Sequence, residues 1–572
     1  MSNGNKKTGA EIIWECLVRE GVEHVFGYPG GAILPTYDAI WKYPIHHVLV
    51  RHEQGAVHMA DGYARAGGKT GVAIATSGPG ATNMVTGIAT AMLDSSPVVC
   101  ITGQVARPLI GYDAFQEVDI TGVTLPITKH NSLVTRTQDI ARSIREAFHI
   151  AQSGRPGPVL VDITKDAQQG SCDFDWDLAA PQLPGYRPPL HSAPTEYDKA
   201  VALINAAKRP VILAGHGILL ANSSRQLIEM AERANIPIAM TLLGIGCAPA
   251  LHPLNLGMMG MHGEAWVNHA IQDADLLIAL GMRFDDRVTG NLKNYAPKAK
   301  KIHVELDRAE VNKNVRVDVA LIGDVREVLE ELLPRVMIGD RAEWLAQINE
   351  IRGSAAVRDI QNLPDTGRLY AAHVINDMWR ETEGGALVVT DVGQHQMWEA
   401  QYYHHRDPRS LITSGGLGTM GFALPAAIGA KLARPDVEVW VVVGDGGFQM
   451  TMCELATLVQ EQLDINIAVI DNGYLGMVRQ WQEFFYDRRY HATPLCNPDF
   501  CRLAESFGVR AMKVIERPEV VSAVRDARAH RGPVLIDFKV EREDSVYPMV
   551  AAGRDLNDMI RRPHPQQSAA GD

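Results

Sequence analysis

One continuous segment, residues 437–472, constrains the fold of this chain more than any other. It reads VEVWVVVGDGGFQMTMCELATLVQEQLDINIAVIDN. The short β-branched run VEVWVVV predicts a buried parallel strand. A helical pattern over residues 451–462 and a second strand over residues 465–470 follow it. A strand, a glycine-rich turn, a helix and a second strand make the repeating unit of α/β folds.

The turn Gly444-Asp445-Gly446-Gly447 and the later Asn472 carry the chemistry of this unit. Glycines let backbone amides approach a ligand closely, and a helix N-terminus favours an anion. Mg²⁺ suits one carboxylate combined with neutral oxygens and a phosphate. Gly-Asp-Gly alone is usually only a turn. The prediction of a magnesium and phosphate site therefore depends on Asn472, which stands at a strand end 28 positions after Gly444.

Length and composition bound what the whole chain can be. Its 572 residues predict three or four domains, and 46% hydrophobic with 21% charged residues is an ordinary globular composition. The formal net charge of −12 argues against nucleic acid as the main partner. We expect no membrane span and no secretory signal. Seven scattered cysteines without a CxxC pair predict reduced thiols in a cytoplasmic protein.

A second unit of the same layout lies nearer the N-terminus. Residues 71–103 predict a strand, a Gly-Pro-Gly turn, a small-residue helix and a strand, so we expect two related α/β domains. The small residues over 81–91 predict close packing, either within the domain or against a second subunit. Earlier, residues 27–32 form a glycine-rich loop, and Glu53 stands at a strand–helix junction, where a glutamate often serves only the helix dipole.

The remaining segments predict a third domain and two linkers. Residues 197–334 alternate strands and helices in a Rossmann-like layout that lacks GxGxxG, and the glycine-rich residues 257–263 and 281–290 suggest ligand contacts. The expected organisation is a first domain (1–169), a proline-rich linker (170–196), a middle domain (197–334), a helical linker (335–368), a last domain (369–548) and a tail (549–572) with a disordered tip.

Several motifs together resemble the catalytic large subunits of the acetohydroxyacid (acetolactate) synthase family, which depends on thiamine diphosphate (ThDP). The resemblance covers residues 8–560. Many ThDP enzymes share the glutamate and the Gly-Asp-Gly, but far fewer also carry RFDDRVTG and QHQMW. The motifs are GYPGGAILP, RHEQGAVHMADGYARA, TSGPGATN, DAFQE with ITKHN, GMHG, RFDDRVTG, TDVGQHQMW, GLGTMGFALPAAIGA, GDGGFQM and GMVRQWQ.

The resemblance implies a fold and a reaction. The fold would be three Rossmann-like domains with mainly parallel sheets: pyrimidine and diphosphate ThDP domains flanking a central FAD-binding domain. Pyruvate would lose CO2 on ThDP, and the two-carbon unit would join pyruvate or 2-ketobutyrate, giving acetolactate or acetohydroxybutyrate for branched-chain amino acids. The cofactors would be ThDP, Mg²⁺ and a structural FAD. Each site would use two chains, so a homodimer or homotetramer is implied, with a possible small regulatory subunit.

The resemblance also assigns roles near the reacting atoms. Glu53 would hydrogen-bond the pyrimidine ring of ThDP from a place sheltered from water. Arg283 would pair with the carboxylate of the acceptor, since a guanidinium binds it bidentately. Trp481 would shape the acceptor pocket and favour the larger ketoacid. The full catalytic set is Gly31, Glu53, Phe115, Gln116, Lys129, Met261, Arg283 and Trp481.

Cofactor ligands follow from the same motifs, with Met420 holding ThDP in a bent shape. Mg²⁺ would be bound by Asp445, Asn472 and the carbonyl of Tyr474. ThDP would contact Pro79, Asn83, Gln104, Val392, Gly393, Gln394, His395, Gly418, Met420, Asp445, Gly446, Gly447, Asn472, Tyr474, Gly476 and Met477. FAD would contact Arg155, Gly215, His216, Gly217, Thr241, Leu242, His262, Gly281, Met282, Arg283, Asp285, Arg287, Val288, Glu305, Asp324 and Val325.

The chain departs from the family pattern at three positions, and two other classes stay open. His216 stands where glycine is common, Ile245 where lysine is common, and Thr164 replaces a usual proline. One alternative is another ThDP enzyme, such as a pyruvate oxidase, a decarboxylase or a glyoxylate carboligase, the last of which is expected to lack the glutamate. The other is a non-catalytic scaffold or sensor, which is expected to have lost Glu53 or Asp445.

Overall fold

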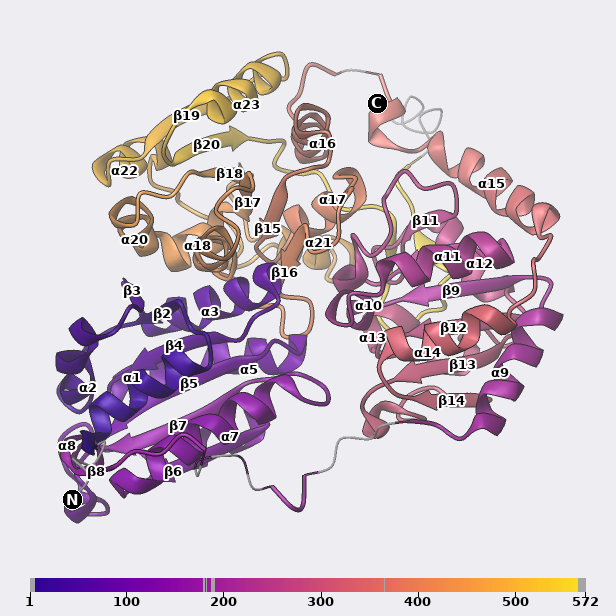
Figure 1. The fold of residues 1–572 in the computed structure, drawn as a ribbon. Helices are drawn as coiled ribbons and strands as arrows, with labels where there is room; N and C mark the ends of the chain where they lie inside the picture. Colours follow the sequence, from indigo (N-terminus) through magenta and orange to yellow (C-terminus); the bar gives the residue numbers. More distant parts are fainter. Residues whose placement is uncertain are drawn as a thin grey trace.

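Three six-stranded sheets, all parallel, organise the protein (Figure 1). The computed structural model describes residues 6–563 except 178, 180, 182, 187–190 and 365. Each of the ranges 1–169, 197–334 and 369–548 contains one of these sheets. The predicted α/β class with three Rossmann-like domains is confirmed. Most of the tip predicted to be disordered, residues 564–572, lies outside the described residues.

The sheet of the N-terminal domain has the order β3-β2-β4-β5-β7-β6. Counted from its own first strand, this order is 2-1-3-4-6-5. Helix α3 (Glu53–Gly67) follows β3, and α4 (Pro79–Asn83) and α5 (Val85–Asp94) connect β4 to β5. The strands are β2 (His24–Gly27), β3 (His46–Leu49), β4 (Gly71–Ala75), β5 (Val98–Gln104), β6 (His130–Val134) and β7 (Val159–Thr164).

The C-terminal domain repeats this topology. Its order, β16-β15-β17-β18-β20-β19, is again 2-1-3-4-6-5, which confirms the two related domains predicted from sequence. Helix α19 (Asp445–Thr451) begins directly after β17, six residues earlier than predicted, so Asp445 and Gly446 lie in the first helical turn and Gly444 ends the strand. The strands are β15 (Leu387–Thr390), β16 (Leu411–Thr413), β17 (Val439–Gly444), β18 (Ile465–Asp471), β19 (Arg510–Val514) and β20 (Val534–Lys539).

The central sheet follows a different order, β11-β10-β9-β12-β13-β14. This is the order 3-2-1-4-5-6 typical of dinucleotide-binding domains, and it reverses between β9 and β12, where such folds form a ligand crevice. The patterns in residues 211–217, 236–241, 275–281 and 301–307 predict four strands of this sheet, and β11 and β14 lie outside them. The strands are β9 (Pro210–Ala214), β10 (Ile238–Met240), β11 (Asn255–Met258), β12 (Leu276–Leu280), β13 (Lys300–Glu305) and β14 (Val319–Ile322).

The two outer domains pack against each other through α3 and α18 (Ala423–Ala433). The helices approach so closely that side chains are excluded. A Cβ on Gly62 would lie 2.0 Å from the carbonyl oxygen of Ala426, and one on Gly429 would lie 1.8 Å from that of Met59. Apolar residues of both domains form one buried cluster, which includes Val57 and Ala426. The outer domains therefore share a single core.

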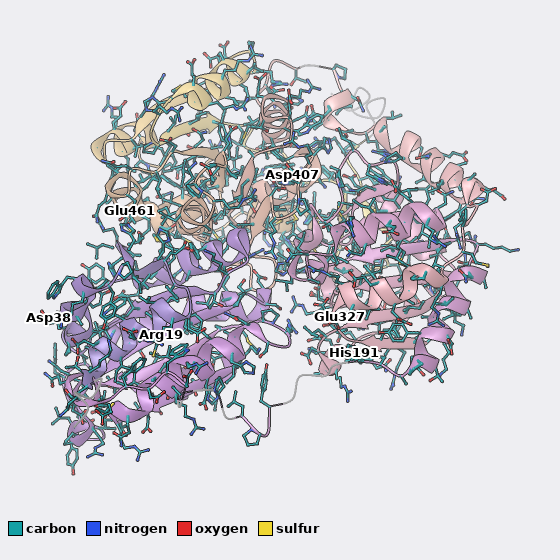
Figure 2. All side chains as sticks on the ribbon, in the orientation of Figure 1. Arg19, Asp38, His191, Glu327, Asp407 and Glu461 are labelled. Atoms are coloured by element: carbon teal, nitrogen blue, oxygen red, sulfur yellow. The ribbon has the colours of Figure 1, made fainter. Side chains whose placement is uncertain are left out.

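Polar contacts mark the borders between the domains. His46 meets Glu461 at 2.6 Å where the outer domains adjoin, and Figure 2 shows Glu461 at that border. Figure 2 also places Asp407 between the C-terminal and central domains, where its carbonyl oxygen would lie 3.1 Å from a Cβ on Gly246. No helix in the described part of the chain has both the length and the apolar character that crossing a membrane requires. All seven cysteines are free.

Candidate active site

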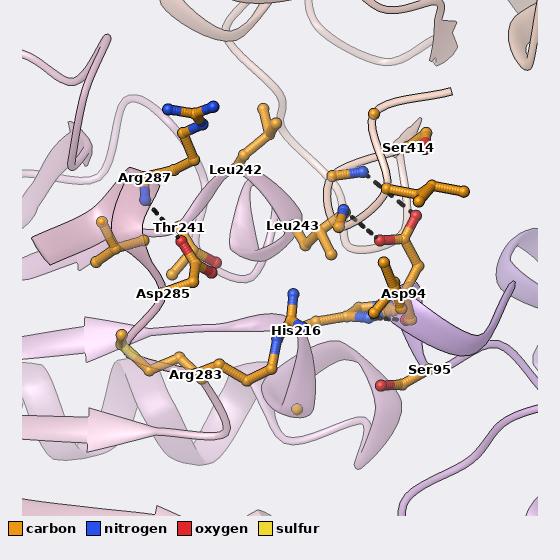
Figure 3. Close-up of a pocket in the computed structure, with 18 of the residues that line it drawn as sticks. Asp94, Ser95, His216, Thr241, Leu242, Leu243, Arg283, Asp285, Arg287 and Ser414 are labelled. Atoms are coloured by element: carbon orange, nitrogen blue, oxygen red, sulfur yellow. Dashed lines mark hydrogen bonds between the residues drawn. The ribbon is translucent and has the colours of Figure 1, made fainter. Parts of the chain in front are cut away.

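A cavity of about 910 Å³ lies where the three domains meet, and segments of all three line it (Figure 3). The central domain contributes residues that follow the carboxyl ends of its strands. The N-terminal domain contributes residues 93–95 and 152–156, and the C-terminal domain contributes residues around 392–397, 414–420 and 477–481. Predicted residues on its wall are Arg155, His216, Gly217, Thr241, Leu242, Met261, His262, Gly281, Met282, Arg283, Asp285, Arg287, Val288, Glu305, Asp324, Val325, Val392, Gly393, Gly418, Met420, Met477 and Trp481.

Glycines close the crevice between β9 and β12. The amide of Gly217 donates to the carbonyl of Gly281 at 2.9 Å, and Gly215 adjoins them although it does not line the cavity. A Cβ on Gly217 would lie 2.6 Å from the Cα of Gly281, which itself has φ +56°. Only glycine fits so close a backbone approach. The two turns therefore pack directly against each other at the switch point.

Carboxylates and basic groups line the same part of the cavity. Asp285 and Asp324 cap short helices by accepting from the amides of Arg287 and Arg326 at 3.1 and 2.8 Å. Glu305 ends β13, and burial raises its pKa to about 7. Carboxylates at such strand ends bind ribose hydroxyls in dinucleotide folds, and guanidinium groups pair with phosphates. This set of donors and acceptors fits FAD.

Asp94 joins the three domains at the edge of the cavity. Its carboxylate accepts from the amides of Gly416 and Gly415 at 2.7 and 3.3 Å, and from Arg65 at 3.4 Å. Its carbonyl accepts from Nδ1 of His216 at 3.0 Å. Figure 3 shows the bonds from His216 and from the backbone amides of the C-terminal domain meeting at Asp94. His216, which departs from the family pattern, therefore forms a contact between the central and N-terminal domains.

The predicted metal ligands lie together in the C-terminal domain. Oδ2 of Asp445 accepts from the amide of Gly473 at 3.0 Å and from Asn497 at 2.7 Å, and Oδ1 of Asn472 accepts from the amide of Tyr474 at 3.0 Å. Burial raises the pKa of Asp445 to about 7, with Asp471 adding to the effect. A divalent cation would offset that cost, so one carboxylate with neutral oxygens fits Mg²⁺. These ligands do not line the cavity but adjoin it, since a Cβ on Gly446 would lie 3.5 Å from the Met420 side chain.

His395 and Gln394 lie between this group and the cavity. The His395 ring is buried against two glycines, because a Cβ on Gly393 or Gly444 would approach it to 3.1 or 2.9 Å. Its Nε2 is buried without a hydrogen-bond partner among the described residues. A buried unpaired ring nitrogen is costly, which fits a ligand such as a diphosphate beside it. The side chain of Gln394 accepts from that of Asn472 at 3.1 Å. Gly447 lies on α19 and Gly476 lies shortly after Tyr474, and neither lines the cavity.

The proposed acceptor residues face the cavity from two domains. Arg283 follows β12 and Trp481 lies on α21 (Gly476–Phe485), where its ring lies 5.2 Å from that of Phe485. Met261 joins them, and its amide donates to the carbonyl of Arg287 at 2.7 Å. The cavity therefore combines a cation with apolar and aromatic walls. Such a pocket can bind a small carboxylate and sort it by side-chain size.

Glu53 lies outside the cavity wall, near the start of α3. It is the first residue of α3, and its Oε2 accepts from Asn83 at 2.9 Å. The loop with Gln116 packs onto Gly78, next to Pro79, and brings Gln116 toward this group. Gln104 instead points to Asp162 at 2.9 Å. None of the predicted residues Gly31, Glu53, Pro79, Asn83, Gln104, Phe115 and Gln116 lines the cavity of the described chain.

Within this chain Lys129 lies apart from the Glu53 group, and its role in the site stays a prediction. It precedes β6 and therefore lies at the amino end of the sheet, whereas Glu53 lies at the carboxyl end. Its ammonium group donates to the carbonyls of Ile150 and Ser153, and burial lowers its pKa to about 8. Lys129 thus fixes the end of α7 (Ile140–Gln152) near Arg155.

Sequence reasoning missed three residues that shape the site. Asp94 and Asn497 lie in stretches without a motif. Asp391 follows β15 within the quoted TDVGQHQMW motif, so its position at a strand end could have identified it. It accepts from the amides of Val392, Gly421 and Ala423 at 3.0 Å each and thereby fixes the loop that carries Met420.

Comparison with known families identifies the domains. Residues 7–123 match the N-terminal TPP binding domain of thiamine pyrophosphate enzymes, residues 197–332 match their central domain, and residues 391–538 match their C-terminal TPP binding domain. The fold and the site thus define a thiamine pyrophosphate-dependent enzyme.

Comparison with individual relatives identifies the family within this class of enzymes. The chain is 49% identical over 567 residues to the acetolactate synthase large subunit of Mycobacterium tuberculosis, covering 97% of this chain and 91% of the relative. It is 48% identical over 567 residues to the acetolactate synthase large subunit of Corynebacterium glutamicum (97% and 90% covered). It is 46% identical over 563 residues to a probable acetolactate synthase large subunit of Methanocaldococcus jannaschii (97% and 95% covered). The chain belongs to the acetolactate synthase large-subunit family.

Proposed function

We propose that the protein is an acetolactate synthase, which decarboxylates pyruvate and joins the two-carbon unit to a second 2-ketoacid. One observation carries this conclusion. Arg283 and Trp481 line the same cavity as Gly418 and Met420, which belong to the loop beside the Gly-Asp-Gly. A carboligase needs a cation that binds the acceptor carboxylate and a wall that selects the acceptor by size. A simple decarboxylase has no acceptor and needs neither. Pyruvate would give acetolactate, and 2-ketobutyrate would give acetohydroxybutyrate for branched-chain amino-acid synthesis.

Each protein group has a physical task in this proposal. ThDP, when bound, would supply the electron sink for decarboxylation. Glu53, shielded from water and oriented by Asn83, would hold a proton at the pyrimidine ring. Arg283 would fix the carboxylate of the acceptor bidentately, and Trp481 would contact its alkyl group. Gly31, Phe115 and Gln116 would form the opposite wall.

Two further cofactors fit the residues present. Asp445, Asn472 and the carbonyl of Tyr474 would hold Mg²⁺ beside the diphosphate, with His395 and Gln394 as neighbours. The switch-point crevice of the central domain would hold FAD, with Glu305 and Asp324 toward its hydroxyl groups and Arg155 toward its phosphates. Such a flavin would be structural in the carboligase reaction, because that reaction transfers no electrons to an acceptor.

A second copy of the chain would complete the site. Within one chain Glu53 does not line the cavity, whereas the Asp445 group adjoins the cavity. Apolar side chains beside both groups are exposed: Phe115 at 87% and Met450 at 57%. Burying them between two copies would bring Glu53 of one chain to the cavity of the other. A homodimer or tetramer follows, with a possible small regulatory subunit, and a cytoplasmic location agrees with the free cysteines.

Product analysis tests the proposal. Purified protein with ThDP, Mg²⁺ and FAD is supplied with pyruvate and 2-ketobutyrate together. We expect mainly acetohydroxybutyrate with some acetolactate and no oxygen uptake. Acetaldehyde as the only product would indicate a decarboxylase, and acetyl phosphate with oxygen uptake would indicate an oxidase. Either result would remove the roles given to Arg283 and Trp481.

A further inference from the structure

A second cavity, of about 430 Å³, lies between the central domain and the C-terminal domain. Its wall comes from β11, the start of α12 (Ala265–Asp273), the end of α15 (Ala342–Ala356), and helices α16 (Ala371–Thr382) and α17 (Gln394–Tyr402). It shares Met258 with the first cavity but contains none of the residues assigned to ThDP, Mg²⁺, FAD or the ketoacids. It is therefore a separate site.

Arginines dominate the charged groups on the wall of this second cavity. Five guanidinium groups and two carboxyl groups line it, in a chain whose formal net charge is −12. The carboxyl groups belong to Glu264 and Asp359. The arginines are Arg352, Arg358, Arg380, Arg561 and Arg562. An acidic protein has thus gathered an excess of positive charge around one cavity.

Most of this charge has no anionic partner. Within the described part of the chain, Arg562 alone among the five lies within 4.0 Å of a carboxylate, at 2.9 Å from Asp544. Arg358 donates to the carbonyl of Arg562 at 3.1 Å, and Arg561 meets Nε2 of His269 at 2.9 Å. Like charges gathered without counter-ions repel one another, and a bound anion would remove that cost.

The carboxyl groups on the wall offset this charge only weakly. Burial raises the pKa of Glu264 to about 8, and Asp359 adds to the effect. Asp359 accepts from the amide of Gln361 at 2.9 Å, and one carboxylate cannot balance five guanidinium groups. His404 and His405 also face the cavity, and burial lowers the pKa of His404 to about 4, so this ring adds no charge at neutral pH. The arginines therefore give the cavity wall a net positive charge.

We propose that this second cavity binds a phosphorylated small molecule of about nucleotide size, held by Arg358, Arg561 and the rim residue Arg380. Planar guanidinium groups bind phosphate oxygens bidentately, and several of them favour a multiply charged group over a single carboxylate. The volume lies within the range of about 300–1,000 Å³ that small-molecule sites occupy. Tyr402, Tyr403 and Trp266 supply aromatic surface for a ring. This ligand would bind in addition to the cofactors of the first cavity.

Calorimetry on the holoenzyme tests this assignment. The protein, saturated with ThDP, Mg²⁺ and FAD, is titrated with ADP and with inorganic pyrophosphate. We expect saturable binding of both, tighter for ADP. Arg358→Gln should weaken both by at least tenfold, and Arg380→Gln, on the exposed rim, should weaken them less without affecting the fold. The matched control is Arg525→Gln, an exposed arginine on α23 (Glu519–Ala529) that pairs with Glu381 at 2.7 Å, and it should bind as the wild type does.

Two results would overturn the assignment. If neither ADP nor pyrophosphate gives a binding heat at millimolar concentration, the cavity holds no phosphorylated ligand. Equal affinity of the Arg358→Gln and Arg525→Gln proteins would mean that the nucleotide binds elsewhere, such as in the first cavity. Product formation from pyruvate is measured on the same samples, so that failure of this assignment stays distinct from failure of the proposed reaction.

Discussion

Replacing Asp94 by alanine should destabilise the whole protein, because this side chain makes buried hydrogen bonds between the N-terminal and C-terminal domains. The carboxylate is 1% exposed and accepts from two C-terminal-domain amides and from Arg65. Its removal leaves the buried guanidinium of Arg65 and both amides without this acceptor. Arg65 keeps one bond, to the carbonyl of Thr413 at 2.8 Å.

The size of the effect follows from burial. Removing one partner of a buried ion pair costs about 3–5 kcal/mol, because the other charge stays buried. Hydrogen bonds to charged groups contribute about 1.5–3 kcal/mol each, so the two amides alone account for a similar figure. We therefore expect Asp94→Ala to lower the free energy of unfolding by about 3–5 kcal/mol. Asp94→Asn should lose less, since it can still accept from Gly416.

Urea unfolding followed by tryptophan fluorescence measures this loss through the shift of the midpoint. The control is Asp273→Ala, whose side chain is half-exposed and pairs with Lys298 at 3.2 Å on the surface. A surface pair of this kind contributes at most about 1 kcal/mol. If Asp94→Ala and Asp273→Ala unfold at the same urea concentration, Asp94 does not connect the domains as described.

Further substitutions test the site and the buried carboxyls. Glu53→Gln should slow turnover by about 10²–10⁴-fold in steady-state assays, and near-normal turnover would remove its role. Asp445→Ala should weaken retention of Mg²⁺ and ThDP in calorimetry, whereas exposed Asp436→Ala should not; unchanged affinity would contradict the metal site. Trp481→Leu should lower the preference for 2-ketobutyrate over pyruvate by about tenfold, and a constant product ratio would argue against the pocket. Burial raises the pKa of Asp162 from 3.8 to about 7, so its contribution to stability is full below about pH 4 and is lost as the pH rises through 7. Asp162→Asn should therefore flatten the fall of the melting temperature between these pH values, and an unchanged profile would exclude Asp162 as its cause.

Strong local patterns made the outer domains predictable. The β-branched strands and glycine-rich turns in residues 71–103 and 437–472 gave both units, and the structure confirms their shared topology. The start of α19 was misplaced because glycine is a poor helix former, so Gly446 and Gly447 suggest a turn. The strand β11 was missed because NLGM is short and contains a glycine. Local sequence carries little signal for such segments, which tertiary pairing stabilises.

The site was predictable where motifs exist and not where contacts are made across domains. Arg283 and Trp481 line the cavity as expected, because each belongs to a recognisable segment. Asp94 could not be found, since its partners lie more than 300 positions away in Gly415 and Gly416. Lys129 belongs to the ITKHN motif, but the motif does not show that it precedes β6, at the end of the sheet away from Glu53.

The glycine-mediated contact between α3 and α18 also determines how the enzyme can open. Because the outer domains share one core, they behave as a single rigid block, and separating them would expose a buried apolar surface. The central domain has its own core, to which the C-terminal domain contributes only a few residues such as Leu411. Moving the central domain against this block would therefore disrupt fewer buried apolar contacts than separating the outer domains. Widening the cavity between the three domains would rely on that motion.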